Sequence, residues 1–473
     1  MDANKIITHK GYAIRKSFLR EKDVEMIMKY CVVEPKIDER YKKSEGKFNI
    51  YKESPTRYYL PREWATLKFG PADENILSEG LNLSDIASSF HGNPYDYQKD
   101  IVNTYLQSER NGLICVPCGK GKTFMALNIA SQIKKRFLIV VDKEFLMNQW
   151  KGEIAGVLPN LRVGIIQADK READGYDCSI CMIQTLCSQS FPEDFFKTYG
   201  FAIFDECHHL GAQHFSKALF KIQTKKMLGL SATPVRADGL TKVFEMFLGK
   251  PLYWEKVREA DPSVVVKGVS ITCQDVDYLR VPYDYKHDVI IARLLTYVVE
   301  CKERNNEIVR WINKMTADPL RKVLVLSARI AHLEALEALL PAETSRSYYI
   351  GGMKEEVRET GARDSSVLLA SYSMASEAMN IKSLNTVVLA SPRSNVEQST
   401  GRILRTRISE RTVQPIIIDI IDPHSPFQSQ WKRRHVYYKK CTYSVETIQQ
   451  GEDAGLETNI VLADENGCLF SDD

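Results

Sequence analysis

Short apolar runs alternate with longer stretches of helical periodicity along most of the chain. Because these runs are almost continuously apolar, they are typical of strands buried on both faces, as in a parallel sheet covered by helices. The first series of predicted strands is Gly112–Val116, Phe137–Val141, Ser179–Ile183, Phe201–Phe204 and Met227–Leu230. The second series is Val323–Leu326, Val367–Ala370, Thr386–Ala390 and Ile416–Ile420. Two such series predict an α/β fold with two similar domains in tandem.

The same pattern sets the expected domain boundaries. The two series occupy residues 91–250 and 286–425, and residues 251–285, which lack a strong period, are expected to form a connector with short strands. Residues 1–90 are expected to form a separate N-terminal accessory domain, and residues 426–473 a C-terminal extension.

Charge and hydropathy narrow the class of protein. Residues 1–70 hold 16 Lys and Arg against 10 Asp and Glu, which favours nucleic-acid binding by the accessory domain, although the net charge of the 473 residues is only +3. No apolar run reaches the roughly 18–20 residues that span a bilayer, and the N-terminus lacks the order of a secretion signal. We therefore expect a soluble intracellular protein, in the cytoplasm or nucleus, without a membrane partner.

Two CxxC pairs occur among the eleven cysteines, Cys115/Cys118 and Cys178/Cys181. The second pair lies in a predicted strand, where residues i and i+3 point to opposite faces, and the first overlaps a glycine-rich turn. We expect buried reduced thiols rather than a zinc site.

The turn from Val116 to Thr123 is the first candidate for chemistry. It follows a predicted strand and opens a helical stretch, and it contains Gly119, Lys120, Gly121 and Lys122. Glycines let consecutive amides face a polyphosphate, and the helix N-terminus adds partial positive charge. In this arrangement Lys122 can reach the β- and γ-phosphates and the Thr123 hydroxyl can ligand Mg²⁺. The first glycine of the GxxxxGK[ST] pattern is replaced by Val116, so an ordinary glycine turn is the alternative.

Two later segments supply partners for this turn. Phe201–Phe204 ends in Asp205-Glu206-Cys207-His208, which brings two carboxylates to the tip of a strand. Asp205 can hold the metal through its water shell and Glu206 can orient or deprotonate the attacking water. The alternative is an exposed acidic turn. The next strand ends in Ser231-Ala232-Thr233-Pro234, which places small hydroxyl residues beside the carboxylates.

A third segment, Gln398-Ser399-Thr400-Gly401-Arg402-Ile403-Leu404-Arg405, carries two arginines three residues apart, on one face of a helix. Such guanidinium groups can stabilise transition-state charge on a γ-phosphoryl group. A basic helical surface is the alternative.

Taken in order, these segments resemble the superfamily 2 helicases, in particular the DNA-directed branch with XPB-type and phage UvsW-type enzymes. The helicases of large nucleocytoplasmic DNA viruses are the closest likeness. The resemblance extends over about residues 94–443 and rests on Tyr97-Gln98, the phosphate loop, DECH, SATP and QSTGRILR, with Ser231–Gly239 close to the SATPxRxDG form. It implies two RecA-like domains and an enzyme that hydrolyses ATP with Mg²⁺.

The resemblance also implies roles for single residues. Gln98 is expected to contact adenine, and Gln398, Arg402 and Arg405 are expected to act in catalysis. The residues expected to couple hydrolysis to domain movement are His208, Ser231 and Thr233. Those expected to contact nucleic acid are Gln149, Trp150, Gln184, Thr185 and Ser373. One departure is Asn380, where the family often has aspartate.

The implied function is an ATP-dependent DNA helicase or translocase that acts in replication, repair, recombination or transcription. A virion or a viral factory is a further location that the resemblance allows. ATP would bridge Lys122, Thr123 and Asp205 to Arg402 and Arg405. A translocase that displaces proteins or transcripts without sustained unwinding stays open, as does an RNA helicase. Proteins of those pathways are expected partners besides nucleic acid.

The C-terminal extension has two contrasting parts. Residues 427–443 hold five basic side chains, four Tyr or Trp residues and no acid, which suits either a nucleic-acid groove with stacking platforms or an amphipathic helix with a solvated basic face. Residues 451–473 hold seven acids and no base, as expected of a solubilising end, with a partner-binding or DNA-mimicking role as the alternative.

Overall fold

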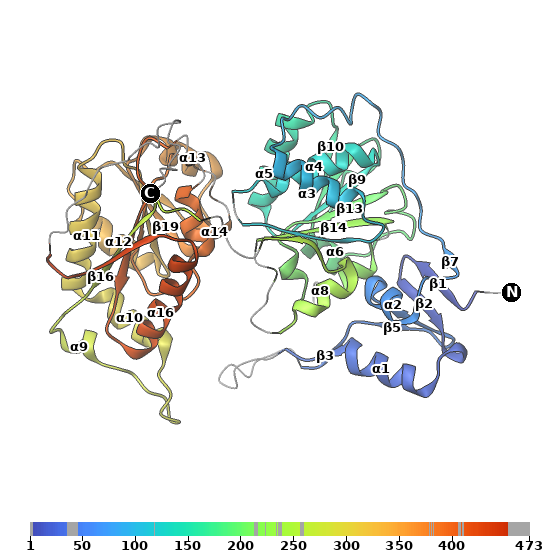
Figure 1. The fold of residues 1–473 in the computed structure, drawn as a ribbon, viewed down its shortest axis with the longest axis horizontal. Helices are drawn as coiled ribbons and strands as arrows, with labels where there is room; N and C mark the ends of the chain where they lie inside the picture. The colour runs from blue at the N-terminus through green and yellow to red at the C-terminus, as the bar shows by residue number, and fades with distance from the viewer. Residues whose placement is uncertain are drawn as a thin grey trace, which may run out of the picture. The chain divides into compact units, whose positions relative to one another are not determined.

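The computed structural model describes residues 3–35, 46–117, 119–211, 216–222, 224–232, 234, 239–255, 260–377, 379, 381, 383–404, 408 and 411–452. The chain divides into two units, Met1–Lys256 and Val257–Asp473, and each has its own apolar cores. Figure 1 shows a sheet with helices on both sides in each unit.

The first unit begins with a small sheet of strand order β5-β6-β2-β1-β7. Its strands are β1 (Lys5–Thr8), β2 (Gly11–Arg15), β5 (Lys52–Glu53), β6 (Arg57–Leu60) and β7 (Glu74–Asn75), with β3 (Val32–Val33) and β4 (Phe48–Asn49) paired separately. Helices α1 (Glu21–Cys31) and α2 (Arg62–Phe69) accompany it. Alternation in β6 buries Tyr58 and Leu60 in a core shared with the large sheet that follows. Arg62 donates to the Thr224 carbonyl at 2.8 Å, so the accessory domain is fixed to the rest of this unit.

The large sheet of the first unit has the order β11-β10-β12-β9-β13-β14-β8-β15 and is parallel except at β11. Its strands are β8 (Gly112–Cys115), β9 (Phe137–Val141), β10 (Val163–Gln167), β11 (Lys170–Arg171), β12 (Cys178–Met182), β13 (Phe201–Phe204), β14 (Lys226–Ser231) and β15 (Pro251–Trp254). The helices are α3 (Asp96–Leu106), α4 (Lys122–Ile133), α5 (Glu144–Val157), α6 (Ile183–Ser188) and α8 (Thr241–Leu248). Alternate residues enter different cores, and Cys178 and Cys181 accordingly lie on opposite faces.

The sheet of the second unit is parallel throughout, with the order β18-β19-β17-β20-β21-β16-β22. Its strands are β16 (Val265–Ser270), β17 (Val323–Ser327), β18 (Arg346–Tyr349), β19 (Val367–Ser371), β20 (Thr386–Leu389), β21 (Ile416–Ile421) and β22 (Ser444–Gln449). One core includes side chains of α10 (Ile291–Glu300), α11 (Lys302–Thr316) and α12 (Ile330–Leu339). The other includes side chains of α13 (Glu355–Asp364), α14 (Tyr372–Glu377) and α16 (Ser425–Lys440). The short helices α9 (Val276–Leu279) and α15 (Glu397–Thr400) complete the unit.

All nine predicted strands are confirmed, with ends that differ by at most one residue. The expected boundaries need correction at two places. Residues 251–285 supply β15 to the first sheet and β16 to the second, so they are parts of both domains as well as a link. Residues 426–452 form most of α16 and all of β22, and β22 pairs with β16 along its whole length. The extension is therefore part of the second sheet domain.

Candidate active site

The phosphate loop joins β8 to α4, at the carboxyl end of the sheet. Gly119 and Gly121 have φ angles of 90° and 77°, in the left-handed region that side chains disfavour. A Cβ atom on Gly121 would also lie 2.6 Å from Nε2 of Gln98. The backbone therefore requires glycine here, which favours a phosphate cradle at the N-terminus of α4 over a chance turn. Cys118 lies outside the described residues.

Gln98 holds this loop from the side of α3. Its Nε2 donates to the Lys120 carbonyl at 3.1 Å, and its Oε1 accepts from the Tyr95 amide at 3.0 Å. Tyr97 donates to the same Lys120 carbonyl at 3.2 Å, and the Lys120 ammonium lies 5.1 Å from the Tyr97 ring centroid. A glutamine amide has one further N–H and one further lone pair, so adenine contact by Gln98 stays a prediction. The structure adds a positioning role for Tyr97, which the sequence did not indicate.

The strand order brings three separate sequence segments together. The phosphate loop follows β8, the DECH segment follows β13, and β14 lies between these two strands in the sheet. In register, Ser231 pairs with Cys115, and Phe204 pairs with Gly229. The carboxyl ends of three neighbouring parallel strands therefore meet at one place, as open α/β sheets require for ligand binding.

A chain of polar contacts connects these strand ends. Nζ of Lys122 lies 3.5 Å from Oε1 of Glu206, and Nδ1 of His208 lies 3.3 Å from Oε2 of the same carboxylate. The His208 ring also contacts the buried Ser231 hydroxyl at 3.0 Å. The coupling role of His208 and Ser231 stays a prediction, and these contacts connect Glu206 to the end of β14. Thr233, the third residue of that set, lies outside the described residues.

Asp205 has an unusual environment for a carboxylate. Burial and the neighbouring charge of Glu206 raise the pKa of Asp205 to about 6, against the opposing hydrogen bond from Trp150. The carboxylates of Asp205 and Glu206 repel each other when both are ionised. A divalent cation bound between them would favour both ionised forms, so the pair suits a metal site. With the hydroxyl of Thr123 one residue beyond Lys122, the donors present are oxygen ligands of the kind that Mg²⁺ prefers.

Trp150 is placed differently from the expectation. The resemblance assigns it to nucleic-acid contact, but its side chain is 1% exposed and its Nε1 donates to Oδ2 of Asp205 at 2.8 Å. The indole therefore orients Asp205, the expected metal ligand, and offers no surface to a nucleic acid. The sequence gives no sign of this contact, because Trp150 and Asp205 lie 55 positions apart and meet only when α5 packs near the end of β13.

The other expected nucleic-acid contacts differ in accessibility. Gln184 is exposed and donates to the Asp142 carbonyl at 2.7 Å, next to the end of β9, and Gln149 is partly exposed on α5. Thr185 is 5% exposed and accepts from the Ala168 amide, so its side chain has a structural partner inside the protein. In the second unit Ser373 is exposed beyond the end of β19.

The expected catalytic arginines are only partly described. Arg402 is 5% exposed and its Nη1 donates to the Met379 carbonyl at 2.7 Å. It lies in a 3-10 turn, Gly401–Leu404, that follows α15. Arg405 and the side chain of Gln398 lie outside the described residues.

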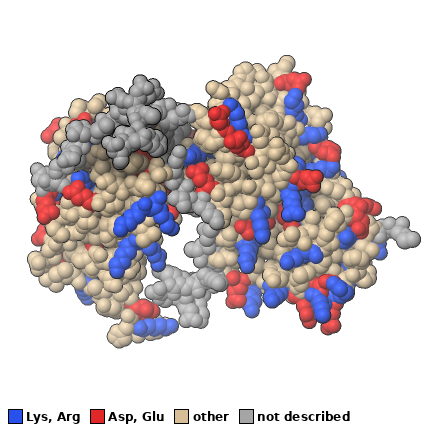
Figure 2. All heavy atoms as spheres, in the orientation of Figure 1, with Lys and Arg blue, Asp and Glu red and all other residues tan. Residues whose placement is uncertain are grey.

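The aromatic side chains of α16 pack inward. Phe427 and Tyr438 are buried, and Arg434 forms an internal ion pair with Asp419 at 2.8 Å. This favours the amphipathic helix over stacking platforms. The exposed basic residues of the helix are Lys432, Arg433, Lys439 and Lys440. Figure 2 shows Lys and Arg side chains gathered over α16 on the visible face of the second unit.

Comparison with known proteins decides the family. The chain is 31% identical over 455 residues to L396 of Acanthamoeba polyphaga mimivirus, whose name describes an ATP-dependent RNA helicase, and the alignment covers 93% of this chain and 86% of the relative. This chain belongs to the superfamily 2 helicases of large DNA viruses. It is therefore an ATP-hydrolysing helicase, and its cofactors are ATP and Mg²⁺.

Other similarities of this helicase agree. QP509L of African swine fever virus (isolate Pig/Kenya/KEN-50/1950), also named an ATP-dependent RNA helicase, is 28% identical over 415 residues, covering 78% of this chain and 77% of the relative. Residues 91–236 match the family model described as type III restriction enzyme, res subunit. A structure of S. cerevisiae Dbp5 bound to RNA and ADP BeF3 matches with a TM-score of 0.54 at 12% identity, over 76% of this chain and 91% of that one. It supports the tandem RecA-like fold.

Within the described residues, no helix combines the length and hydropathy that crossing a bilayer would require.

Proposed function

We propose that this helicase moves along DNA and separates or remodels duplexes, with ATP hydrolysed at the phosphate loop of the first unit. The observation that carries this proposal is the continuous set of contacts from Lys122 through Glu206 and His208 to Ser231, over three adjacent strand ends. Glu206, which would contact the attacking water, is thereby connected through His208 to the end of β14. Movement driven by hydrolysis requires such a connection.

Each residue of the site has a proposed task. ATP with Mg²⁺, when bound, supplies the hydrolysable phosphoryl group and a divalent charge. Lys122 would bind the β- and γ-phosphates, and Thr123 and Asp205 would hold the ion, Asp205 through water. Glu206 would orient the attacking water and accept its proton. Gly119, Lys120 and Gly121 would supply backbone amides to the phosphates.

The second unit is proposed to supply positive charge to the reaction. Arg402 and Arg405 would stabilise charge on the transferred phosphoryl group, and Gln398 would help to position the water. Arg402→Lys keeps the charge but loses the planar fork, so a large loss of kcat with little change in thermal stability would support catalysis. If Arg402→Lys keeps full turnover, the assignment fails.

DNA is the proposed substrate because Ser231–Gly239 resembles the form found in DNA-directed enzymes, and because residues 91–236 match a restriction-enzyme subunit model. RNA is the second candidate, since the mimivirus and African swine fever virus relatives are both named RNA helicases.

One set of assays on the purified chain distinguishes the candidates. ATP hydrolysis is measured with single-stranded DNA, duplex DNA and single-stranded RNA, beside strand displacement from DNA and RNA duplexes, with Lys122→Ala as the inactive control. We expect stimulation and displacement with DNA. Stimulation by RNA alone would reverse the assignment, and DNA-stimulated hydrolysis without displacement would indicate a translocase.

A further inference from the structure

The loop between α9 and α10 presents two tyrosines to solvent. Tyr285 is 89% exposed and Tyr283 is 55% exposed. In Figure 1 this loop projects beyond the helices of the second unit. We call residues 282–290 the tyrosine finger. Nζ of Lys286 lies 5.7 Å from the centroid of the Tyr285 ring, and most of that ring is left open to solvent, where an aromatic partner could stack on it.

The tyrosine finger is ordered by its own backbone. Oδ1 of Asp284 accepts from the amides of Lys286 at 2.8 Å and Asp288 at 2.9 Å. The Asp284 amide donates to the Asp288 carbonyl at 2.9 Å, and Tyr283 forms an antiparallel bridge with Val289. These bonds fix the tip as a tight turn, which lowers the entropy lost when Tyr285 meets a partner.

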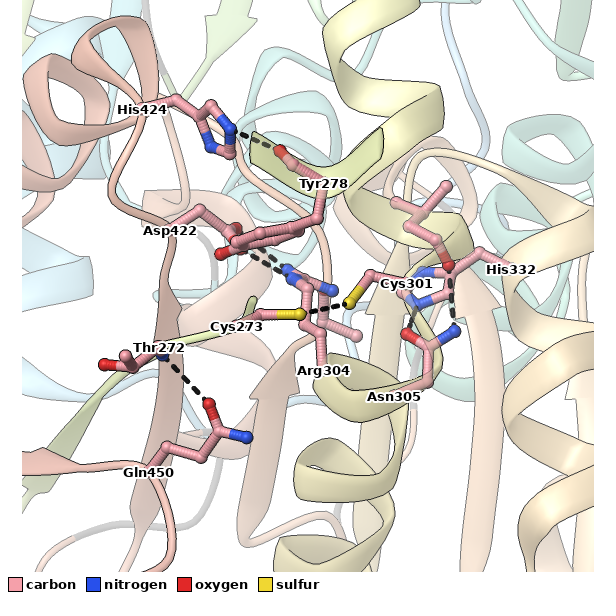
Figure 3. A network of polar contacts seen from close by, with 12 residues as sticks. Thr272, Cys273, Tyr278, Cys301, Arg304, Asn305, His332, Asp422, His424 and Gln450 are labelled. Atoms are coloured by element: carbon pink, nitrogen blue, oxygen red, sulfur yellow. Dashed lines mark hydrogen bonds and ion pairs between the residues drawn. The ribbon is translucent and has the colours of Figure 1, made fainter. Parts of the chain in front are cut away.

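The base of the tyrosine finger is anchored in a buried polar network (Figure 3). The Tyr278 hydroxyl of α9 donates to Oδ1 of Asp422 at 2.9 Å, and Nε2 of His424 lies 2.7 Å from the Tyr278 carbonyl oxygen. Arg304, fully buried, donates to both oxygens of Asp422 and to the Ala390 carbonyl. Because Asp422 and Ala390 follow β21 and β20 directly, α9, which precedes the finger, is held at these strand ends.

The tyrosine finger lies at the carboxyl end of the strands. All seven strands are parallel, so β16, which leads into the finger, ends on the same side as β17 and β19. That side carries Ser373, an expected nucleic-acid contact, and the exposed Arg329, whose Nη2 lies 3.5 Å from the Ala292 carbonyl of α10. The finger, Ser373 and Arg329 therefore lie at the same end of the sheet, and Arg329 lies near the start of α10, directly after the finger.

We propose that the tyrosine finger contacts nucleotide bases at the point where the duplex opens, with Tyr285 stacking on the first base and Tyr283 supporting it. This inference rests on the proposed function of strand separation. It names a residue for the step that distinguishes a helicase from a translocase. Stacking on an aromatic face is tolerant of sequence, since every base has such a face.

Charges of both signs surround the two tyrosines. The exposed Arg280, Lys286 and Arg293 lie among the exposed Asp275, Asp277 and Asp288, so the aromatic faces rather than the net charge would supply the contact with nucleic acid. The two rings offer roughly 300 Å² of exposed area, given about 200 Å² for a whole aromatic side chain. Stable protein interfaces bury about 800 Å² on each partner, so the two rings alone are too small to form one.

The test compares Tyr285→Ala, Tyr285→Trp and the control Leu320→Ala. Leu320 is 68% exposed and lies three residues before the start of β17, so it is at the opposite, amino-terminal end of the same parallel strands. Strand displacement and single-strand-stimulated ATP hydrolysis are measured for each variant. We expect Tyr285→Ala to lower strand displacement about tenfold or more, because one stacked base corresponds to roughly 5- to 150-fold in an equilibrium constant. Hydrolysis should stay within about twofold, and the tryptophan and control variants should match the wild type.

A second readout does not depend on unwinding. A forked DNA and a forked RNA with 2-aminopurine at the junction are titrated with each variant without nucleotide, and wild type and Tyr285→Trp should change the fluorescence where Tyr285→Ala does not. Displacement by Tyr285→Ala at the wild-type rate overturns the inference and leaves the proposed function intact. If the wild type displaces no strand, the proposal of strand separation fails and a translocase is indicated, and the fluorescence then decides the finger alone. Equal fluorescence for all variants rejects base contact. This holds also if a protein partner proves to bind the finger.

Discussion

Asp422 is the acceptor on which the buried network of the second unit depends. It accepts hydrogen bonds from Nε of Arg304 at 2.7 Å, from Nη2 of Arg304 at 3.0 Å and from the Tyr278 hydroxyl at 2.9 Å, and neither ionic side chain is exposed. We predict that Asp422→Asn lowers the free energy of unfolding of this unit by about 3–5 kcal/mol. Asparagine keeps the shape but leaves the Arg304 charge buried without its counter-charge.

The magnitude is large enough to be measured locally. A unit of this size shifts in Tm by roughly 2–4 °C for each kcal/mol, so the expected change is about 6–20 °C. Because a chain with two units does not unfold in one step, a whole-chain melting curve is insufficient. Hydrogen–deuterium exchange on peptides of β21 and α11 reports the opening free energy of this unit itself.

Two further variants make the reasoning refutable. Asp277→Asn removes the same charge from an exposed position of α9 and should change the opening free energy by less than about 0.5 kcal/mol. The double variant Arg304→Met with Asp422→Leu removes both charges and should be less destabilised than Asp422→Asn, since no unpaired charge remains. If Asp422→Asn costs under about 1 kcal/mol, or the double variant is the worse of the two, the ion pair does not hold this network.

The remaining predictions concern the phosphate loop and its surroundings. Lys122→Ala should abolish ATP hydrolysis and leave circular dichroism unchanged; normal turnover would remove the loop assignment. Glu206→Gln should retain nucleotide binding, measured with a fluorescent ATP analogue, but lower kcat by a factor of about 10²–10⁴, the usual contribution of a general base. Trp150→Phe should raise the Mg²⁺ concentration needed for half-maximal hydrolysis, since Asp205 loses a hydrogen bond; an unchanged requirement would contradict that link. Gly121→Ala should weaken the analogue's binding about tenfold, because its φ of 77° and the approach to Gln98 disfavour a Cβ atom.

The sequence predicted the fold well where burial determines the pattern. Strands such as Phe137–Val141 and Phe201–Phe204 are covered on both faces, so their residues are apolar without interruption and their limits are sharp. The strands that were missed lie nearer the sheet edges or mix small and polar residues. β16 contains Lys267 and Gly268, and β22 reads Ser-Val-Glu-Thr-Ile-Gln. Their partners come from far along the chain, which a local pattern does not contain.

The candidate site shows the same division. Lys122, Asp205 and Glu206 could be proposed from local spacing, because phosphate and metal binding use short contiguous segments. The contact of Trp150 with Asp205 and the support of the phosphate loop by Tyr97 depend on how helices lie against the sheet. The tyrosine finger is a further case, since the exposure of Tyr285 becomes informative only once the turn that holds it is known.

Glu206 has a strained backbone that its side-chain contacts require. Its φ of 42° lies in the left-handed region, which costs a non-glycine residue about 1–2 kcal/mol. The conformation directs the carboxylate toward both Lys122 and His208, while the Glu206 amide donates to Oδ1 of Asp205 at 2.9 Å. A relaxed backbone would have to give up some of these contacts. Since His208 also contacts Ser231, any change of charge at Glu206 acts on the end of β14 through a single side chain. The strained backbone therefore joins the residue proposed for hydrolysis to the strand proposed to transmit it.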